Sequence, residues 1–116
     1  MRMWMAALIT LAMGPAVAFA QPAANPDDVS KGHYLAVMVC SICHVAAPDQ
    51  ERMPMLKPPA PPFAEIAQRA DTNAASLTKF ISTTHRGLDS PAGMPNPRLA
   101  DYQVEEVVAY ILSLRK

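Results

Sequence analysis

The chain has few of the residues on which most enzymes and metal clusters depend. Among its 116 residues it has two cysteines, three histidines and one tryptophan, and its basic and acidic residues balance at ten each. No carboxylate pair, nucleophile triad or phosphate-binding loop is visible. The charge balance argues against binding to nucleic acid or to an acidic membrane surface. A chain of this length forms at most one domain with a modest core.

The alternation of apolar and polar residues that marks a half-buried strand is also missing. Apolar residues instead recur at helical spacing in several segments, and the 12 prolines of the chain lie largely between these segments. Internal repeats are absent from the sequence. The pattern therefore predicts an all-α fold.

The only long apolar run lies at the start of the chain. A basic start is followed by apolar residues over 3–13 and then by Ala18-Phe19-Ala20, which fits a small-x-small cleavage site. This pattern is typical of a secretory signal peptide and is too short for an ordinary membrane span. We therefore predict a signal peptide at 1–20 and a mature domain at 21–116, located in the periplasm without stable membrane insertion. An uncleaved N-terminal anchor is the alternative.

Cleavage would change the composition on which the fold depends. The mature chain would lose Trp4, Arg2 and four of the eight methionines, and its formal charge would become −1. The aromatic residues expected to pack are Phe63, Phe80, Tyr102 and Tyr110, with Tyr34 at the surface. A domain of this size has only a small core.

Both cysteines fall in one pentapeptide, Cys40-Ser41-Ile42-Cys43-His44. Helix positions three apart share a face, so the two thiols can each form a thioether with a vinyl group of one porphyrin. His44 would then lie under the porphyrin plane, where an imidazole nitrogen can bind iron. Cys-x-x-Cys-His is the attachment signature of c-type haem, so we predict one covalent haem c at Cys40, Cys43 and His44.

Two alternatives to haem use the same cysteines. A thioredoxin-like redox dithiol requires a βαβ setting, which this chain does not show. A zinc site requires a second Cys or His pair to complete four ligands, and the sequence has none. An exported protein also meets an oxidising compartment where two cysteines can form a disulfide, so location alone does not decide their fate.

The segment before the signature has the pattern of a helix. Asn25 is a suitable N-cap, Pro26 suits the first helical position, and apolar residues then recur at helical spacing as far as Cys43. This helix would deliver the haem signature at its C-terminal end. Gly32 within it costs about 1 kcal/mol relative to alanine, so either another helix approaches closely there or the glycine is merely tolerated.

Six prolines between His44 and Phe63 forbid a continuous helix and predict an extended loop able to wrap one side of a flat ligand. Three helices are expected after this loop. The first spans 63–70 and the last spans 101–114. The middle helix is capped at Thr72 or Asn73, reaches Thr84 and ends in a turn at Gly87. A Gly- and Pro-rich loop over 88–98 contains Met94. Arg115 and Lys116 would lie at the negative end of the last helix.

This order of elements resembles that of a small class I c-type cytochrome of the bacterial periplasmic type, over nearly all of the mature chain. In that family a glycine eight residues before the first cysteine packs against an aromatic residue of the last helix, and Gly32 and Tyr110 occupy these positions. The resemblance implies N- and C-terminal helices that cross around the haem. It also implies that Met94 is the distal iron ligand and that Pro61 lies at the carbonyl that orients His44.

The other residues able to bind iron are Met38, Met53, Met55, His33 and His85. Met38 is expected to pack within the first helix, and His33 to be solvated. The two loop methionines lie on the proximal side, whereas Met94 is far enough along the chain to reach the opposite face. His85 as a ligand would give a bis-histidine haem of lower potential; otherwise it lies near a propionate with Arg86 or Arg98.

Ligation by His44 and Met94 would leave iron six-coordinate, and the soft sulfur would raise its reduction potential. The resemblance therefore implies one-electron transfer rather than enzyme catalysis, with redox protein partners at the exposed haem edge. The alternatives are a haem subunit bound to a larger periplasmic dehydrogenase subunit, a gas- or peroxide-reactive haem protein with an open iron position, and a haem-free dithiol oxidoreductase.

Overall fold

The computed structural model describes residues 23–83 and 93–116. The predicted signal peptide, the expected turn at Gly87, and the residues Thr84, His85 and Arg86 lie outside the described residues. The helices are α1 (Pro26–Val39), the 3₁₀ turn η1 (Cys40–Ile42), α2 (Phe63–Gln68), α3 (Ala74–Ser82) and α4 (Asp101–Ser113). Over the described ranges no strand is present, and the only bridge joins His44 to Ala60. The prediction of an all-α fold is confirmed.

The helices begin at the residues that can cap them. The Asn25 side chain accepts a hydrogen bond from the Asp27 N–H at 3.1 Å, so α1 starts as the sequence predicts. At α3, Asn73 and Ser76 form a reciprocal capping box, which selects Asn73 over Thr72 as the cap. At α4, where Ala100 has no side-chain acceptor, the Gln103 side chain accepts from the Ala100 N–H at 3.0 Å.

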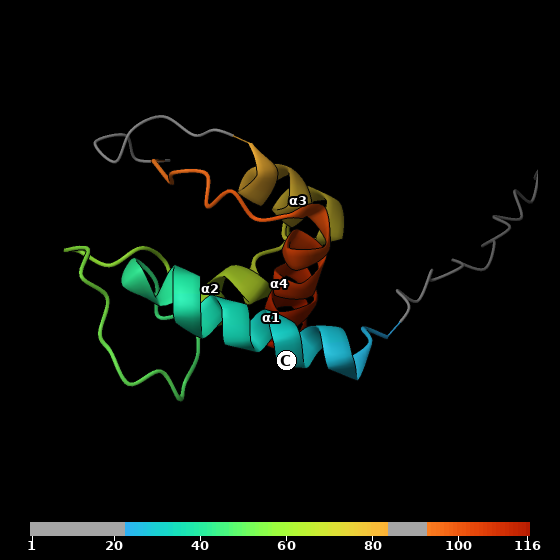
Figure 1. Cartoon of the computed structure of the whole chain (residues 1–116), viewed down its shortest axis with the longest axis horizontal. Helices are drawn as coiled ribbons and strands as arrows, with labels where there is room; N and C mark the ends of the chain where they lie inside the picture. Colours follow the sequence, from blue (N-terminus) through green and yellow to red (C-terminus); the bar gives the residue numbers. More distant parts are fainter. Residues whose placement is uncertain (1–22, 84–92) are drawn as a thin grey trace, which may run out of the picture.

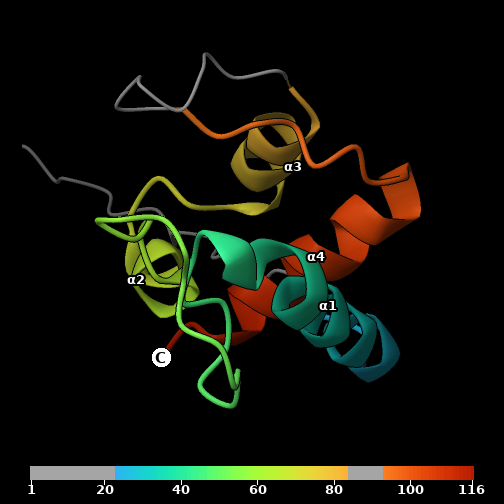
Figure 2. The same cartoon turned by 60° about the vertical axis from the view of Figure 1, so that its left-hand side comes forward.

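Helices α1 and α4 make the most extensive contact between helices, and α2 and α3 also contact α4. Figure 1 shows α1 crossing in front of α4, and the view in Figure 2 preserves this arrangement. The crossing depends on Gly32, because a Cβ built there would collide with the Glu106 carbonyl oxygen and lie 2.9 Å from the Tyr110 Cβ. The predicted close approach of the two helices at Gly32 is confirmed.

The core lies along α4 and is made mostly of small side chains. Its buried apolar members are Ala36, Ala46, Ala47, Phe63, Ala67, Leu77, Ile81, Val104, Val107, Val108, Tyr110 and Ile111. Four of these twelve are alanines, so the side chains fill little volume. Two of the four aromatic residues expected to pack, Phe63 and Tyr110, are buried as predicted.

Three packing predictions are wrong because of helical phase. Met38 is 59% exposed and Tyr102 is 63% exposed. Each lies two positions from a buried residue of its helix, Ala36 or Val104, and at 100° per residue this places it on the opposite face. Phe80 is 43% exposed and borders the buried face of α3 rather than occupying its centre.

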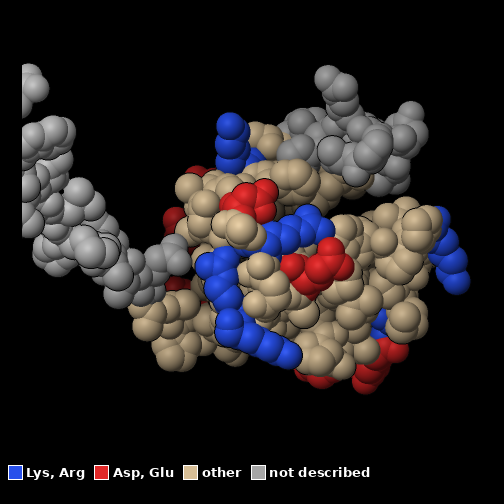
Figure 3. All heavy atoms as spheres, turned by 180° about the vertical axis from the view of Figure 1, so that it is seen from behind, with Lys and Arg blue, Asp and Glu red and all other residues tan. Residues whose placement is uncertain are grey.

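No helix in the described ranges is long and apolar enough to cross a membrane. The space-filling view in Figure 3 shows basic and acidic side chains interspersed on one face of the molecule. Neither sign dominates that face, in agreement with the balanced composition of the whole chain.

Candidate haem site

The two cysteines lie on one turn at the end of α1. The helical path continues through η1, in which the N–H groups of Cys43 and His44 both donate to the Cys40 carbonyl at 3.1 and 2.9 Å. The Ser41 hydroxyl donates to the Val37 carbonyl at 2.6 Å and secures the turn to the preceding helix. Both thiols are free and half-buried. Helix α1 therefore brings both sulfur atoms to a single turn, as the spacing requires.

The His44 ring is fixed by the proline-rich loop. Its Nδ1 lies 2.7 Å from the Pro61 carbonyl oxygen, and its ring centre is 5.2 Å from that of Phe63. Burial lowers the pKa of His44, while the hydrogen bond to Pro61 acts in the opposite direction. A neutral ring that donates from Nδ1 keeps its lone pair on Nε2, which is the arrangement found in metal-binding histidines. The expected contact with Pro61 is confirmed.

Backbone hydrogen bonds fold this loop against the signature. The N–H groups of Met55, Ala60 and Phe63 donate to the carbonyls of Ile42, Cys43 and Val45 at 2.8, 2.9 and 3.0 Å. The loop thus returns alongside residues 42–45 instead of extending into solvent. These bonds explain how a chain with six prolines in this region holds the Pro61 carbonyl in one place.

Gln50 organises the first half of the loop, a role that sequence reasoning missed. Its Oε1 accepts from the N–H groups of Ala46 and Ala47 at 2.6 and 3.2 Å, and its Nε2 donates to the Arg52 carbonyl at 2.8 Å. The same nitrogen lies 3.4 Å from the His44 carbonyl. A lone glutamine carries no local sequence signal for such a role.

A second contact joins this loop to the helix crossing. The Tyr110 hydroxyl donates to the Ala46 carbonyl at 3.1 Å, and the His33 ring meets the Tyr110 ring edge-on at 5.2 Å. The His33 Nε2 lies 2.8 Å from the Asp49 carboxylate, and this hydrogen bond lowers the pKa of Asp49. His33 keeps 36% of its side chain exposed, as expected of a solvated residue, but its neighbour Gly32 also brings it against α4.

Cys40 does not have the electrostatics of a reactive thiol. Burial, together with the neighbouring Cys43, raises the pKa of the Cys40 thiol to about 11. Catalytic and redox-active cysteines instead have a lowered pKa, since the thiolate is the nucleophile. The environment of Cys40 therefore argues against the dithiol alternative.

Met94 lies in the segment 93–100, which leads into α4. The side chain is half-buried, whereas Met53 and Met55 are fully exposed on the loop. In Figures 1 and 2 this segment runs beside α3, above the C-terminal end of α1, while the proline-rich loop bends around that end. Such a course suits a ligand from the face opposite His44, and iron binding by Met94 stays a prediction.

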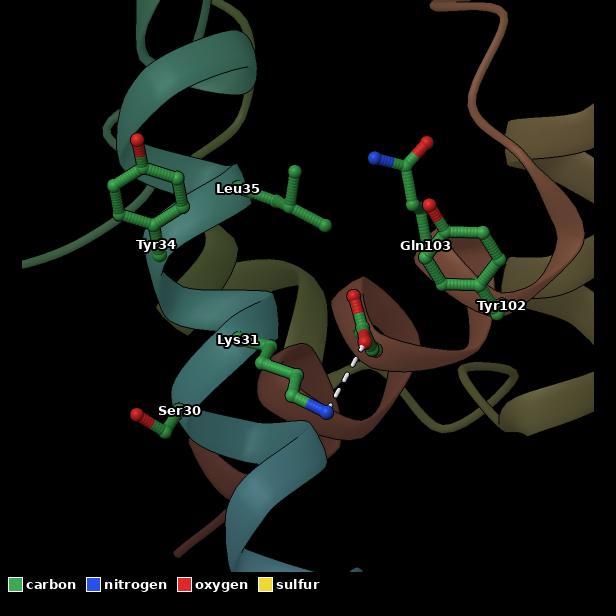
Figure 4. Close-up of a pocket in the computed structure, with 7 residues that line it drawn as sticks. Ser30, Lys31, Tyr34, Leu35, Tyr102 and Gln103 are labelled. Atoms are coloured by element: carbon green, nitrogen blue, oxygen red, sulfur yellow. Dashed lines mark ion pairs between the residues drawn. The ribbon is translucent and has the colours of Figure 1, made fainter.

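An open pocket of about 520 Å³ lies elsewhere, between the middle of α1 and the first half of α4. It is lined by Ser30, Lys31, Tyr34, Leu35, Tyr102, Gln103 and Glu106 (Figure 4). Lys31 and Glu106 form an ion pair at 3.9 Å within it. Within the described ranges, no group of three or more His, Cys, Asp or Glu side chains is placed to hold a metal ion.

The residues at the signature fit a covalently attached haem. Two free thiols lie on one turn, and the adjacent His44 ring has its Nδ1 engaged with the Pro61 carbonyl, so two sulfur atoms and the His44 Nε2 remain for the group. An all-α chain with this donor set belongs to the class of proteins that hold haem through two thioethers. The two cysteines would therefore attach the haem and His44 would bind its iron, with the core along α4 behind them.

A comparison with known proteins identifies the family to which the chain belongs. The family model described as Cytochrome c matches residues 29–115, so the chain belongs to the cytochrome c family. No curated protein and no solved structure matches the chain. Membership implies haem-based electron transfer through covalently bound haem c, and proteins of this family are in general electron carriers rather than enzymes.

Proposed function

We propose that the chain is a periplasmic one-electron carrier in which His44 and Met94 bind the haem iron on opposite faces. The observation that carries this proposal is the hydrogen bond between the His44 Nδ1 and the Pro61 carbonyl at 2.7 Å. It directs the free lone pair of Nε2 away from the loop and makes the imidazole a stronger ligand. Residues 1–20 would direct export and be cleaved.

Each residue of the site has a separate task in this proposal. Cys40 and Cys43 hold the haem edge through thioethers, and Pro61 fixes the ring plane of His44. Met94 supplies a soft sulfur ligand that closes the sixth position and favours ferrous iron. The haem, when bound, would supply an iron centre that gains or loses one electron with little change in its geometry. The chain would therefore transfer electrons without binding a substrate at iron.

Redox partners would dock beside the attachment turn. Met38 on α1 and Ile42 in η1 are exposed there, and the hydrogen bond from the Met55 N–H to the Ile42 carbonyl places the exposed loop methionine next to Ile42. Exposed apolar side chains in a cluster are typical of interaction surfaces, and methionine adapts to several partners. The same cluster would suit permanent attachment to a larger dehydrogenase subunit. Co-purification with such a subunit would favour that second function.

Replacement of the methionines tests the ligand set. The holoprotein is exported from cells competent in cytochrome maturation, and its ferric spectrum is recorded for the parent and for Met94→Ala, Met53→Ala and Met55→Ala. We expect haem to stay with the polypeptide after denaturing extraction, and Met94→Ala alone to abolish the weak far-red sulfur-to-iron band. A band that survives in Met94→Ala but disappears in a loop variant would exclude Met94 as the ligand.

A further inference from the structure

Asn96, the second residue after Met94, forms side-chain hydrogen bonds in two directions. Its Oδ1 accepts from the Arg98 N–H at 2.8 Å, and its Nδ2 donates to the Ser82 carbonyl at 3.3 Å. The first bond closes a turn in which Arg98 has a φ of 54°, a left-handed conformation that is uncommon for residues other than glycine. The second bond joins this turn to a different element, the end of α3.

Ser82 is a suitable anchor because it ends a helix that is packed into the core. The last carbonyls of a helix have no intrahelical partner, and at the end of α3 side chains donate hydrogen bonds to several of them. The Thr83 hydroxyl donates to the Lys79 carbonyl at 2.7 Å, and Asn96 donates to the Ser82 carbonyl. Since Leu77 and Ile81 bury α3 against the rest of the core, the bond from Asn96 ties the segment 93–100 to a fixed point.

The backbone between Asn96 and Met94 is stiff. Pro95 and Pro97 follow Met94 and Asn96 respectively. Proline fixes its own φ and restricts the preceding residue to extended conformations. A constraint on the position of Asn96 therefore also constrains the position of Met94, whereas flexible residues between the two would weaken this coupling.

We propose that Asn96 is a positioning residue for the distal iron ligand, because its amide ties the Met94 segment to the end of α3. This inference rests on the proposed function, since it takes Met94 as the ligand. Asn96 touches neither the iron nor the thioether in this scheme. It limits the conformations that the free segment could adopt and so favours those in which the Met94 sulfur stays bound.

Competition by imidazole tests this role in the ferric holoprotein. Imidazole displaces a weakly held thioether, and the loss of the far-red band reports its midpoint concentration. Asn96→Ala removes both bonds, whereas Asn96→Asp keeps the acceptor for Arg98 but has no donor for Ser82. We expect both variants to lose the band at an imidazole concentration lower by on the order of tenfold, as for the loss of one net hydrogen bond.

Asn25→Ala is the matched control. The Asn25 Oδ1 also accepts from the N–H two residues later, but Asn25 lies at the start of α1 and has no connection to Met94. It should lose a similar amount of stability in denaturant unfolding and keep the parental imidazole midpoint. Parental midpoints for both Asn96 variants would overturn the proposal, and so would a parental midpoint for Asn96→Asp alone. If the parent itself lacks the band, or Met94→Ala retains it, the ligand assignment fails instead, and the positioning role fails with it.

Discussion

At the scale of single residues, Gly32 decides whether α1 and α4 can cross. A methyl group there would meet the backbone of Glu106, which cannot move without shifting α4. We expect Gly32→Ala to lower the free energy of unfolding of the holoprotein by ~2–4 kcal/mol, despite the better helix propensity of alanine. Denaturant unfolding measures the loss. Ser30→Ala, on the exposed face of the same helix, should change it by less than about 0.5 kcal/mol. If the parent and Gly32→Ala were equally stable, α1 and α4 would have to lie farther apart at their crossing than the structure shows.

Tyr110 is a second single residue whose effect can be isolated, because only its hydroxyl reaches the loop. Tyr110→Phe keeps the buried ring against His33 and removes the hydrogen bond to the Ala46 carbonyl. We expect a loss of about 1 kcal/mol at neutral pH. Tyr102→Phe, which changes a 63% exposed ring, should have no measurable effect.

The stability difference between the parent and Tyr110→Phe should also depend on pH. Burial raises the pKa of Tyr110 above its usual value of 10.0, and the nearby Asp49 acts in the same direction. A group whose pKa is raised on folding stabilises fully below its unfolded pKa and loses this effect as the pH rises through its folded pKa. The difference should therefore be constant up to about pH 10 and narrow above it. A stability difference that persists unchanged at higher pH would show that the Tyr110 hydroxyl has the same pKa in the folded and unfolded protein.

At the scale of elements, Arg115 joins the end of α4 to two other segments. Its Nε donates to the Ala67 carbonyl at 3.0 Å, and its Nη2 donates to the Thr72 carbonyl. The sequence places Arg115 at the helix C-terminus for the dipole alone, but the side chain serves to dock α2 and the start of α3. The planar guanidinium can satisfy both carbonyls at once, whereas an ammonium group has no such fork.

Arg115→Lys keeps the charge and removes this geometry. We expect a loss of about 1 kcal/mol in denaturant unfolding. Lys116→Ala is the control, because only its backbone N–H takes part in the neighbouring contact with Gln68. If the lysine variant were as stable as the parent, charge at the helix end would be sufficient, and the two hydrogen bonds would contribute nothing.

The elements were predictable from the sequence because local chemistry determines them. Asn25, Pro26 and Asn73 mark helix starts by their own capping ability, and Gly32 marks a close contact by the Cβ it lacks. The burial of Phe63 and Tyr110 also followed from the pattern. By contrast, the exposure of Tyr102 depends on which residues of α4 face the core, a question of phase that a short apolar pattern leaves open.

The connections between elements could not be predicted in the same way. Gln50, His33, Asn96 and Arg115 act through partners that lie from two to 48 residues away in the chain. Polar side chains of this kind pair with whichever carbonyl or carboxylate the fold places nearby, so their roles appear only in three dimensions. The Pro61 contact with His44 is an exception, because the resemblance to class I cytochromes implied it.

At the scale of the whole molecule, the core is too small to explain the fold by itself. Of the twelve apolar residues buried within the described ranges four are alanines, and Val107 is the largest side chain there with less than 2% of its surface exposed. A small core contributes correspondingly little apolar burial to set against the loss of conformational entropy. A covalently held haem would add a large apolar surface between the loop, α1 and the Met94 segment, and would thereby complete the core.

Cys40→Ala/Cys43→Ala, produced without haem, tests this dependence directly. We expect the double variant to lose most of its far-ultraviolet helical signal and to unfold without a cooperative transition, since α1 and α4 would retain only their small-residue contact. The single variants are the control: each can keep one thioether and His44, and each should remain helical when matured with haem. A haem-free double variant with full helical content and a sharp transition would contradict the prediction. Twelve mostly small side chains would then suffice for the fold, and the haem would serve electron transfer alone.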